Sequence, residues 1–448
     1  MKKIFLLAVV VIIGMLLRVS LYLDSPMYTT DGTTGYTYPD ANEYLNCMAY
    51  ILEHDLWDYF CNEISVELAC GMPLYLTLMH TIFDGNFQHI RILGIFLSCV
   101  QIVLVYQIAL KVFRDFRIAI LAAIFLALNI DIANFSYTLL TETISLFCWS
   151  MFVYFYLLSK ENNQFYKICI ILSAIFLCMA TLIRAISLLL PAAMIFLYGI
   201  YYLWRKDQKV KSELRTWLAI GAVFYILISP FIIKNHVLFN FNNLCTGGGT
   251  ALFLGSKLEY QGDEPAFYGS DYGCIYEVIG PNSHRKIKSD RELYAAGVEN
   301  IKSHFHEYCI MNIKKIARLT IGTNFSMILQ TVGKHNIKEV YETYDYETTL
   351  KVVARIFFNT FVYAFAILGI YRHYKNFSLS SIILMPMYFL VFSLPFLAIF
   401  RYGFILFIFA ALLASSEIIC QYQSKQYNLT FIGLLSAVLM EMYILSGF

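Results

Sequence analysis

Apolar stretches of about twenty residues recur along this chain, and they constrain its fold more than any other feature. A helix rises about 1.5 Å per residue, so about 20 apolar residues cross the ~30 Å hydrocarbon core of a bilayer. Hydrophobic residues make up 59% of the 448-residue sequence and charged residues only 14%, whereas soluble domains carry about 25% charged residues. We therefore predict an integral membrane protein that crosses the bilayer many times.

The predicted fold is an all-α polytopic membrane protein with about eleven transmembrane helices. The first stretch is interpreted as a retained span, because it is close to spanning length and no small-residue cleavage site follows it. Residues 68–84 are a further candidate for a re-entrant or spanning segment. The predicted spans are 4–23, 87–111, 117–133, 142–159, 167–183, 185–204, 216–234, 352–371, 377–396, 402–420 and 427–446.

Lysine and arginine in the short loops predict the orientation. With this set of spans they all fall on one side of the bilayer, and the positive-inside rule makes that side cytoplasmic. The N-terminus is therefore predicted inside and the C-terminus outside. The residues concerned are Lys2, Lys3, Lys111, Arg114, Arg117, Lys160, Lys167, Arg205, Lys206, Lys209, Lys211, Arg215, Arg372, Lys375 and Lys425. Arg18, near the outer end of the first span, is expected to snorkel to the interface.

This orientation places two long segments on the outer side. Residues 1–234 are predicted to form an N-terminal transmembrane catalytic module, with a first outer loop at 24–86. Residues 235–350 are polar and long enough for a small outer domain, predicted as α/β or mixed. Residues 351–448 are predicted to supply the C-terminal transmembrane helices.

An amphipathic helix is predicted in the first outer loop. In the run ANEYLNCMAYILEH, apolar residues recur at helical spacing, and charged residues occupy other positions. This pattern is typical of a helix that lies in the membrane interface. The apolar set is Tyr44, Leu45, Met48, Ile51 and Leu52, and the polar set is Glu43, Glu53 and His54.

The sequence offers little evidence for cofactors. It has no CxxC or HExxH motif, so no transition-metal site and no cofactor are predicted, and a divalent metal is left open. No basic stripe indicates nucleic acid.

Thr246–Gly249 resembles a phosphate cradle, but no GK[ST] follows, so we predict a turn that requires positive φ. One or two disulfides are compatible with the cysteines in the outer segments, with pairing left open. These are Cys47, Cys61, Cys70, Cys245, Cys274 and Cys309.

Two acidic residues turn this architecture into a chemical hypothesis. Asp40 lies in YTYPDANEYL, after the first span, and Glu142 lies in SYTLLTETISL, at the start of a later one. Carboxylates at the lipid–water boundary are unfavourable unless they are paired or functional, so both are candidate site residues. The structural alternatives are a loop or helix cap for Asp40 and an N-cap with Thr141 for Glu142, because acids favour helix N-termini.

The order of short motifs resembles the GT-C superfamily of membrane glycosyltransferases, in particular the branch of dolichyl-phosphate-mannose-protein mannosyltransferases and aminoarabinose transferases. The first acidic residue stands as Pro-Asp-Ala instead of Asp-Glu, and no WWDYG-type run is present, which argues against an oligosaccharyltransferase. The motifs are Asp40–Tyr44, Met72–Leu76, Lys111–Arg114, Leu140–Glu142, Ala180–Arg184, Pro230–Phe239, Thr246–Gly249, Leu252–Gly255 and Arg401–Tyr402.

The resemblance implies a sugar donor carried on a polyprenyl phosphate and an acceptor hydroxyl on a glycan, lipid or protein. It implies Asp40 as the general base of an inverting transfer, assisted by Glu142. Arg184 and Arg401 would stabilise the departing phosphate, or would serve only as interface anchors. Asn42, Glu43, Tyr44, His54 and Tyr402 are expected to line the substrate site. The composition suggests a bacterial cell membrane, with the active site facing the periplasm or exterior.

Two other functions stay open at this point. An O-antigen polymerase or ligase also spans the bilayer many times, although its large outer loop usually comes late in the chain. A transporter or flippase needs polar or ionisable groups near the middle of the bilayer. In the predicted topology the acids lie at the outer boundary, which counts against transport.

Overall fold

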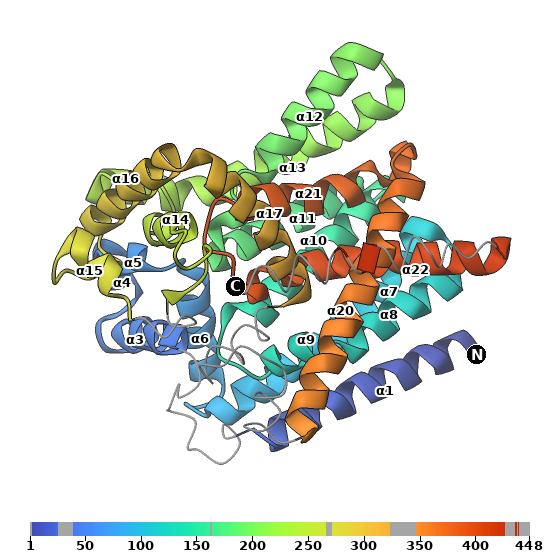
Figure 1. Cartoon of the computed structure of the whole chain (residues 1–448), viewed down its shortest axis with the longest axis horizontal. Helices are drawn as coiled ribbons and strands as arrows, with labels where there is room; N and C mark the ends of the chain where they lie inside the picture. The colour runs from blue at the N-terminus through green and yellow to red at the C-terminus, as the bar shows by residue number, and fades with distance from the viewer. Residues whose placement is uncertain are drawn as a thin grey trace. The chain divides into compact units, whose positions relative to one another are not determined.

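The computed structural model describes residues 2–25, 39–161, 164–265, 271–322 and 346–425, together with residues 435, 436 and 438 (Figure 1). Every regular element in these ranges is a helix, and they contain no strand. The chain divides into two compact units, Met1–Cys245 and Thr246–Phe448. The helical part of the predicted fold class is thus confirmed, and the predicted limits of the three domains stay a prediction.

The first unit contains six of the long apolar helices and the helices of two outer loops. Its long helices are α1 (Lys2–Leu23), α7 (Phe87–Phe113), α10 (Thr141–Glu161), α11 (Tyr166–Ile183), α12 (Leu190–Arg205) and α13 (Gln208–Phe239). Shorter helices are α3 (Pro39–His54), α4 (Leu56–Cys61), α5 (Ile64–Glu67), α6 (Gly71–Ile82), α8 (Phe116–Leu128), α9 (Ile130–Phe135) and the 3₁₀ turn η1 (Ala185–Ser187).

The second unit holds the outer segment and the last described spans. Its elements are α14 (Gly248–Ser256), α15 (Gly273–Ile279), α16 (Ile287–Ser303), α17 (Phe305–Ile321), α20 (Tyr346–His373), α21 (Ser380–Ser393), α22 (Phe404–Ser424), and the 3₁₀ turns η3 (Phe377–Leu379) and η4 (Phe400–Gly403). Every regular element in the described part of 235–350 is a helix, so the strands of the α/β alternative are not found there. Amphipathic runs such as Ile287–Ser303, which has a helical period, explain this preference.

Eight helices of the described residues are long and apolar enough to cross a membrane, and they coincide with eight of the eleven predicted spans. The predicted span 117–133 is broken: α8 ends at Leu128, and the side chain of Asn129 caps α9 by accepting a hydrogen bond from the Ile132 N–H at 2.9 Å. The predicted span 377–396 is the shorter helix α21. The predicted span 427–446 falls almost wholly outside the described residues.

Arg18 does not snorkel, which corrects the sequence-based expectation. Its side chain is completely buried. The guanidinium donates hydrogen bonds to Ser98 Oγ at 2.8 Å and to the carbonyl oxygen of Ala127 at 3.2 Å. Carbonyls in the last turn of a helix lack a partner within the helix. Arg18 therefore satisfies the end of α8, which stops there because of Asn129.

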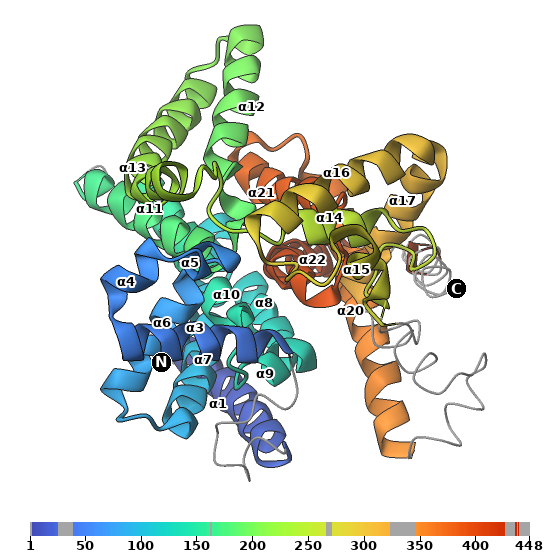
Figure 2. The ribbon, with the colours of Figure 1, turned by 90° about the vertical axis from the view of Figure 1, so that its left-hand side faces the viewer.

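The helices α12 and α13 run as an antiparallel pair (Figures 1 and 2). Their outward faces are apolar and exposed: Phe196 is 66% exposed, Leu203 75% and Ile226 71%. Such faces are stable in lipid and not in water. By contrast, α22 is almost wholly buried, so it forms the centre of the second unit.

The Thr246–Gly249 turn has the positive φ predicted from its glycines, with φ at +92° for Gly247. The backbone N–H groups that could bind a phosphate in this turn are hydrogen-bonded to a carboxylate of the same chain. The N–H groups of Gly247 and Gly249 both donate to Oδ1 of Asp290, each at 2.8 Å. The N-terminus of α14 is therefore fixed to α16, and this explains the resemblance to an anion site.

Candidate active site

Asp40 lies in the first turn of α3, where the helix dipole favours a carboxylate. The helix predicted in the first outer loop is confirmed, but its apolar face is covered by protein. Met48 and Ile51 are buried, and Met48 packs against Met72 and Leu76 of α6. The packing of α3 on α6 therefore sets the direction in which Asp40 enters the site.

The other predicted substrate residues of α3 fall at different places along it. Asp40, Glu43 and Tyr44 are half-buried, whereas Asn42 is exposed. Tyr44 contributes to two apolar clusters, so part of its role is packing. His54 ends the helix fourteen positions after Asp40, which corresponds to about 21 Å along the axis. One small sugar site cannot include both residues, and His54 stacks instead on Tyr50 at 4.3 Å between ring centroids.

Glu142 and Arg184 form a buried ion pair. Arg184 Nη2 donates to Glu142 Oε1 at 2.6 Å, and the side chains are 17% and 2% exposed. Arg184 Nε donates to Thr141 Oγ1 at 2.8 Å. The structure thus brings two predicted site residues together, one from the start of α10 and one from the residue after α11. A buried carboxylate of this kind is stable only when a cation and hydrogen bonds compensate its lost hydration.

The second outer loop, residues 129–140, is held by the neighbouring span α7. Gly94 lies so close to the backbone of Ser136 that an added Cβ would overlap its carbonyl oxygen. Gln101 Nε2 donates to the carbonyl of Thr143 at 2.9 Å, one residue after Glu142. The position of Glu142 therefore depends on close contact between α7 and this loop.

The sequence interpretation missed two polar residues of this loop, because both were included in an apolar span. Asn129 and Asp131 are 2% and 4% exposed. The signal was present as Asn129-Ile-Asp131 within an apolar run, since Asn and Asp favour helix N-termini. Asp131 adds a second buried carboxyl-bearing side chain, besides Glu142, near the predicted outer boundary.

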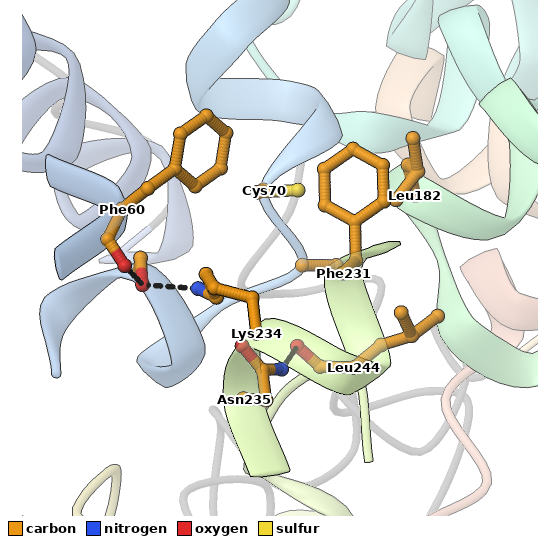
Figure 3. A pocket seen from close by; sticks show the side chains of 9 residues that line it. Phe60, Cys70, Leu182, Phe231, Lys234, Asn235 and Leu244 are labelled. Atoms are coloured by element: carbon orange, nitrogen blue, oxygen red, sulfur yellow. Dashed lines mark hydrogen bonds between the residues drawn. The ribbon is translucent and has the colours of Figure 1, made fainter. Parts of the chain in front are cut away.

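A small pocket lies beside the end of α11 in the first unit (Figure 3). Phe60, Leu182 and Phe231 supply apolar walls, and Lys234 and Asn235 of α13 supply polar groups. Lys234 Nζ donates to Ser65 Oγ at 2.8 Å. This contact joins α13 to the first outer loop.

Arg401 and Tyr402 belong to the second unit, in the 3₁₀ turn η4 that leads into α22. Both are half-buried, and the Arg401 guanidinium lies 5.7 Å from the Tyr402 ring centroid. The Arg-Tyr pair thus opens a late helix, as predicted.

The described residues contain no group of three or more His, Cys, Asp or Glu side chains that could hold a metal ion. The part of the chain that the structure describes contains no disulfide, so none joins the six outer cysteines.

The fold and the site define a multi-pass helical membrane protein with carboxylates and arginines at the predicted outer ends of its helices. Residues 70–233, which include Glu142 and Arg184, match the family model of dolichyl-phosphate-mannose-protein mannosyltransferases. The predicted resemblance to GT-C membrane glycosyltransferases is therefore confirmed. No curated protein matches the chain.

Solved structures of an archaeal oligosaccharyltransferase from Archaeoglobus fulgidus have a similar fold. The apo form matches with a TM-score of 0.52 and 11% identity, over 99% of this chain and 55% of that one. The complex of this enzyme, AglB, with an inhibitory peptide and a dolichol-phosphate matches with a TM-score of 0.51 and 11% identity, over 100% of this chain and 55% of that one. The form with zinc and sulfate matches with a TM-score of 0.51 and 14% identity, over 98% of this chain and 52% of that one. This chain spans about half the length of these structures, and the likeness concerns the fold alone.

Proposed function

We propose that this protein is a membrane glycosyltransferase that transfers a sugar from a polyprenyl-phosphate donor to an acceptor hydroxyl at the outer face of the membrane. The observation that carries the proposal is the family match over residues 70–233, because these residues build the buried Glu142–Arg184 pair. The dolichol-phosphate in one AglB structure agrees with a lipid-phosphate ligand for this fold. The sugar is a hexose or pentose, and the acceptor is a cell-envelope glycan, lipid A or protein.

In the proposed reaction, the acceptor oxygen forms a bond to C1 of the sugar while the C1–oxygen bond to phosphate breaks. The hydroxyl proton passes to the Asp40 carboxylate, which acts as general base. The polyprenyl phosphate leaves with the bonding electrons, and a single displacement inverts the anomeric centre. Asp40 suits this role because it is half-buried in the first turn of a helix at the predicted headgroup level.

The leaving phosphate gathers negative charge, and a fixed guanidinium can stabilise it. Arg184 is our first candidate, since Thr141 and Glu142 already orient it. Arg401 is the second candidate. In this proposal Glu142 acts chiefly by holding Arg184 in place. A direct contact between Glu142 and the acceptor would require this ion pair to shift.

The test uses purified protein in nanodiscs with a panel of radiolabelled polyprenyl-phosphate sugars and an envelope extract as acceptor. Release of polyprenyl phosphate is followed for the wild type, Asp40→Asn and Glu53→Gln. Glu53 is an exposed carboxylate on the same helix and serves as the matched control. We expect Asp40→Asn to lose at least 100-fold in rate, in line with general-base catalysis of about 10²–10⁴, and Glu53→Gln to keep wild-type activity.

Release by the wild type and by Glu53→Gln, but not by Asp40→Asn, would identify the donor sugar and support Asp40 as the base. Equal release by Asp40→Asn would exclude Asp40 as the base. No release from any donor by a folded wild type would favour a polymerase or ligase that uses longer diphosphate-linked glycans, and would reject the proposed donor class. Movement of label across the bilayer of sealed proteoliposomes without bond cleavage would favour a transporter.

A further inference from the structure

An irregular segment, residues 394–399, separates α21 from the Arg401 turn in the second unit. It lies between an apolar helix and a predicted membrane span. Backbone that is not helical exposes N–H and C=O groups, and near a membrane such backbone is tolerated only where protein satisfies these groups. The question is which groups of this unit do so.

Part of the answer is backbone contact. The Leu397 N–H donates to the Ala251 carbonyl of α14 at 2.8 Å, and the Ala398 N–H donates to the Gly262 carbonyl at 3.2 Å. Gly255 lies directly against the backbone of Phe396, where any side chain would overlap it. The segment is therefore held on one side by α14 and by the loop that follows it.

The carbonyl groups of this region converge on one buried ammonium. Lys315 of α17 is completely buried. Its Nζ donates to the carbonyl oxygens of Gly255 at 2.6 Å, Leu394 at 3.0 Å and Phe396 at 3.1 Å. All three N–H bonds of the ammonium are thereby used, and all of their acceptors are backbone atoms of α14 and the irregular segment.

One further cation and one carboxylate lie near Lys315. Asp263, on the loop after α14, forms an ion pair with Arg318 at 3.2 Å, and each of these side chains is 1% exposed. The charged and titratable groups that face Lys315 are Asp263 from the loop, and Arg318 and Tyr308 from its own helix. One turn further along α17, Leu319 lies against Gly403 of η4 so closely that a Cβ on Gly403 would overlap its carbonyl oxygen.

We propose that Lys315 is a positioning residue that fixes residues 394–403, and thereby holds Arg401 in place to contact an anionic phosphate of a lipid headgroup. The role of Arg401 rests on the proposed function. The anchoring itself does not, because it follows from the three carbonyl contacts and the Gly403 contact.

The test compares Lys315→Met with Lys302→Met, which removes an exposed lysine from α16. Hydrogen–deuterium exchange is followed for peptides covering 394–403 and 287–303, and binding of radiolabelled polyprenyl phosphate is measured in nanodiscs, with Arg401→Met as reference. We expect Lys315→Met to raise exchange of 394–403 at least tenfold, with 287–303 unchanged. We also expect it to raise the Kd for polyprenyl phosphate at least fivefold, as Arg401→Met does.

Faster exchange with wild-type binding would reject the positioning role, and wild-type exchange would reject the anchor. Neither hydrogen–deuterium exchange nor phosphate binding requires sugar transfer. The experiment therefore separates failure of this inference from failure of the proposed function. Lys315→Gln covers the case in which Lys315→Met does not fold. Its amide keeps N–H donors on a shorter side chain that cannot reach all three carbonyl oxygens, so exchange of 394–403 should rise at least threefold above the wild type. Wild-type exchange in Lys315→Gln would reject the anchor.

Discussion

Gly94 of α7 lies directly against the carbonyl oxygen of Ser136, and this contact sets how closely the second outer loop approaches the membrane helices. Gly94→Ala should therefore displace the loop and, through it, Glu142. We expect a cost of about 1–3 kcal/mol, typical of overpacking, and at least a tenfold loss of sugar transfer. Thermal unfolding in detergent and the nanodisc assay measure the two effects. Gly199→Ala in α12 is the control, since a Cβ there meets nothing within 4 Å. Equal behaviour of the two variants would argue against a tight contact.

The Glu142–Arg184 pair predicts a non-additive pattern of stability. Glu142→Gln or Arg184→Met alone leaves a buried charge without its partner, which costs about 3–5 kcal/mol. The double variant should lose clearly less than the sum of the two single losses. Unfolding temperatures of the four proteins complete the cycle. Glu161→Gln, at a pair with Lys111 in which the glutamate is 39% exposed, should cost less than about 1 kcal/mol. Additive losses would mean that the two side chains do not interact in solution.

Asp290→Ala tests whether the glycine turn depends on an internal carboxylate. The N–H groups of Gly247 and Gly249 would lose their acceptor, and leaving buried donors unsatisfied costs about 1–3 kcal/mol each. Exchange of the amides at 247–251 should rise, as measured by mass spectrometry. Added inorganic phosphate should not slow this exchange if the turn is purely structural. Glu299→Ala, an exposed site on the same helix, should leave the turn unchanged.

Asp263 predicts an acid-side trend in stability. Burial, partly offset by Arg318, raises the pKa of Asp263 to about 6 from its ordinary 3.8. Between these values the folded state binds the proton and the unfolded state does not, so stability rises as pH falls from 6 to about 4. The unfolding temperature of the wild type should therefore increase relative to Asp263→Asn over this range. Glu299→Gln should show no such relative change, and a constant difference for Asp263→Asn would contradict the raised pKa.

Local pattern explains most of the correct predictions. Runs such as Phe87–Phe113 and Phe404–Ser424 need only length and apolar composition to be identified as spans. The helical period of 39–54 likewise predicts α3, although the sequence alone cannot show that α6 covers its apolar face. The pairing of Glu142 with Arg184 joins residues 42 positions apart. The motif order placed both at the same predicted membrane level, but the contact itself depends on tertiary packing.

The predictions that failed did so for two reasons: a local helix cap was overlooked, or a distant contact decided the outcome. Asn129 looked like a tolerated polar residue inside a span, yet it ends α8 and starts α9. Lys315 and Arg318 belong to the polar segment 235–350, yet both are buried. Their acceptors are mainly backbone carbonyls, and no sequence pattern reveals which carbonyls a fold leaves unpaired. The same reason explains why Arg18 was assigned to the interface.

Arg18 also constrains the order in which the chain can be assembled. The first helix leaves the ribosome more than one hundred residues before Ala127, the acceptor that its guanidinium contacts. An arginine inside a helix that enters lipid alone costs about 2.5–3.5 kcal/mol on the scale of translocon-mediated insertion. The strongly apolar remainder of the first helix can offset this cost during insertion. The guanidinium gains its carbonyl acceptor at the end of α8 only once that helix has been made, so the contact is completed after the first helix has entered the membrane.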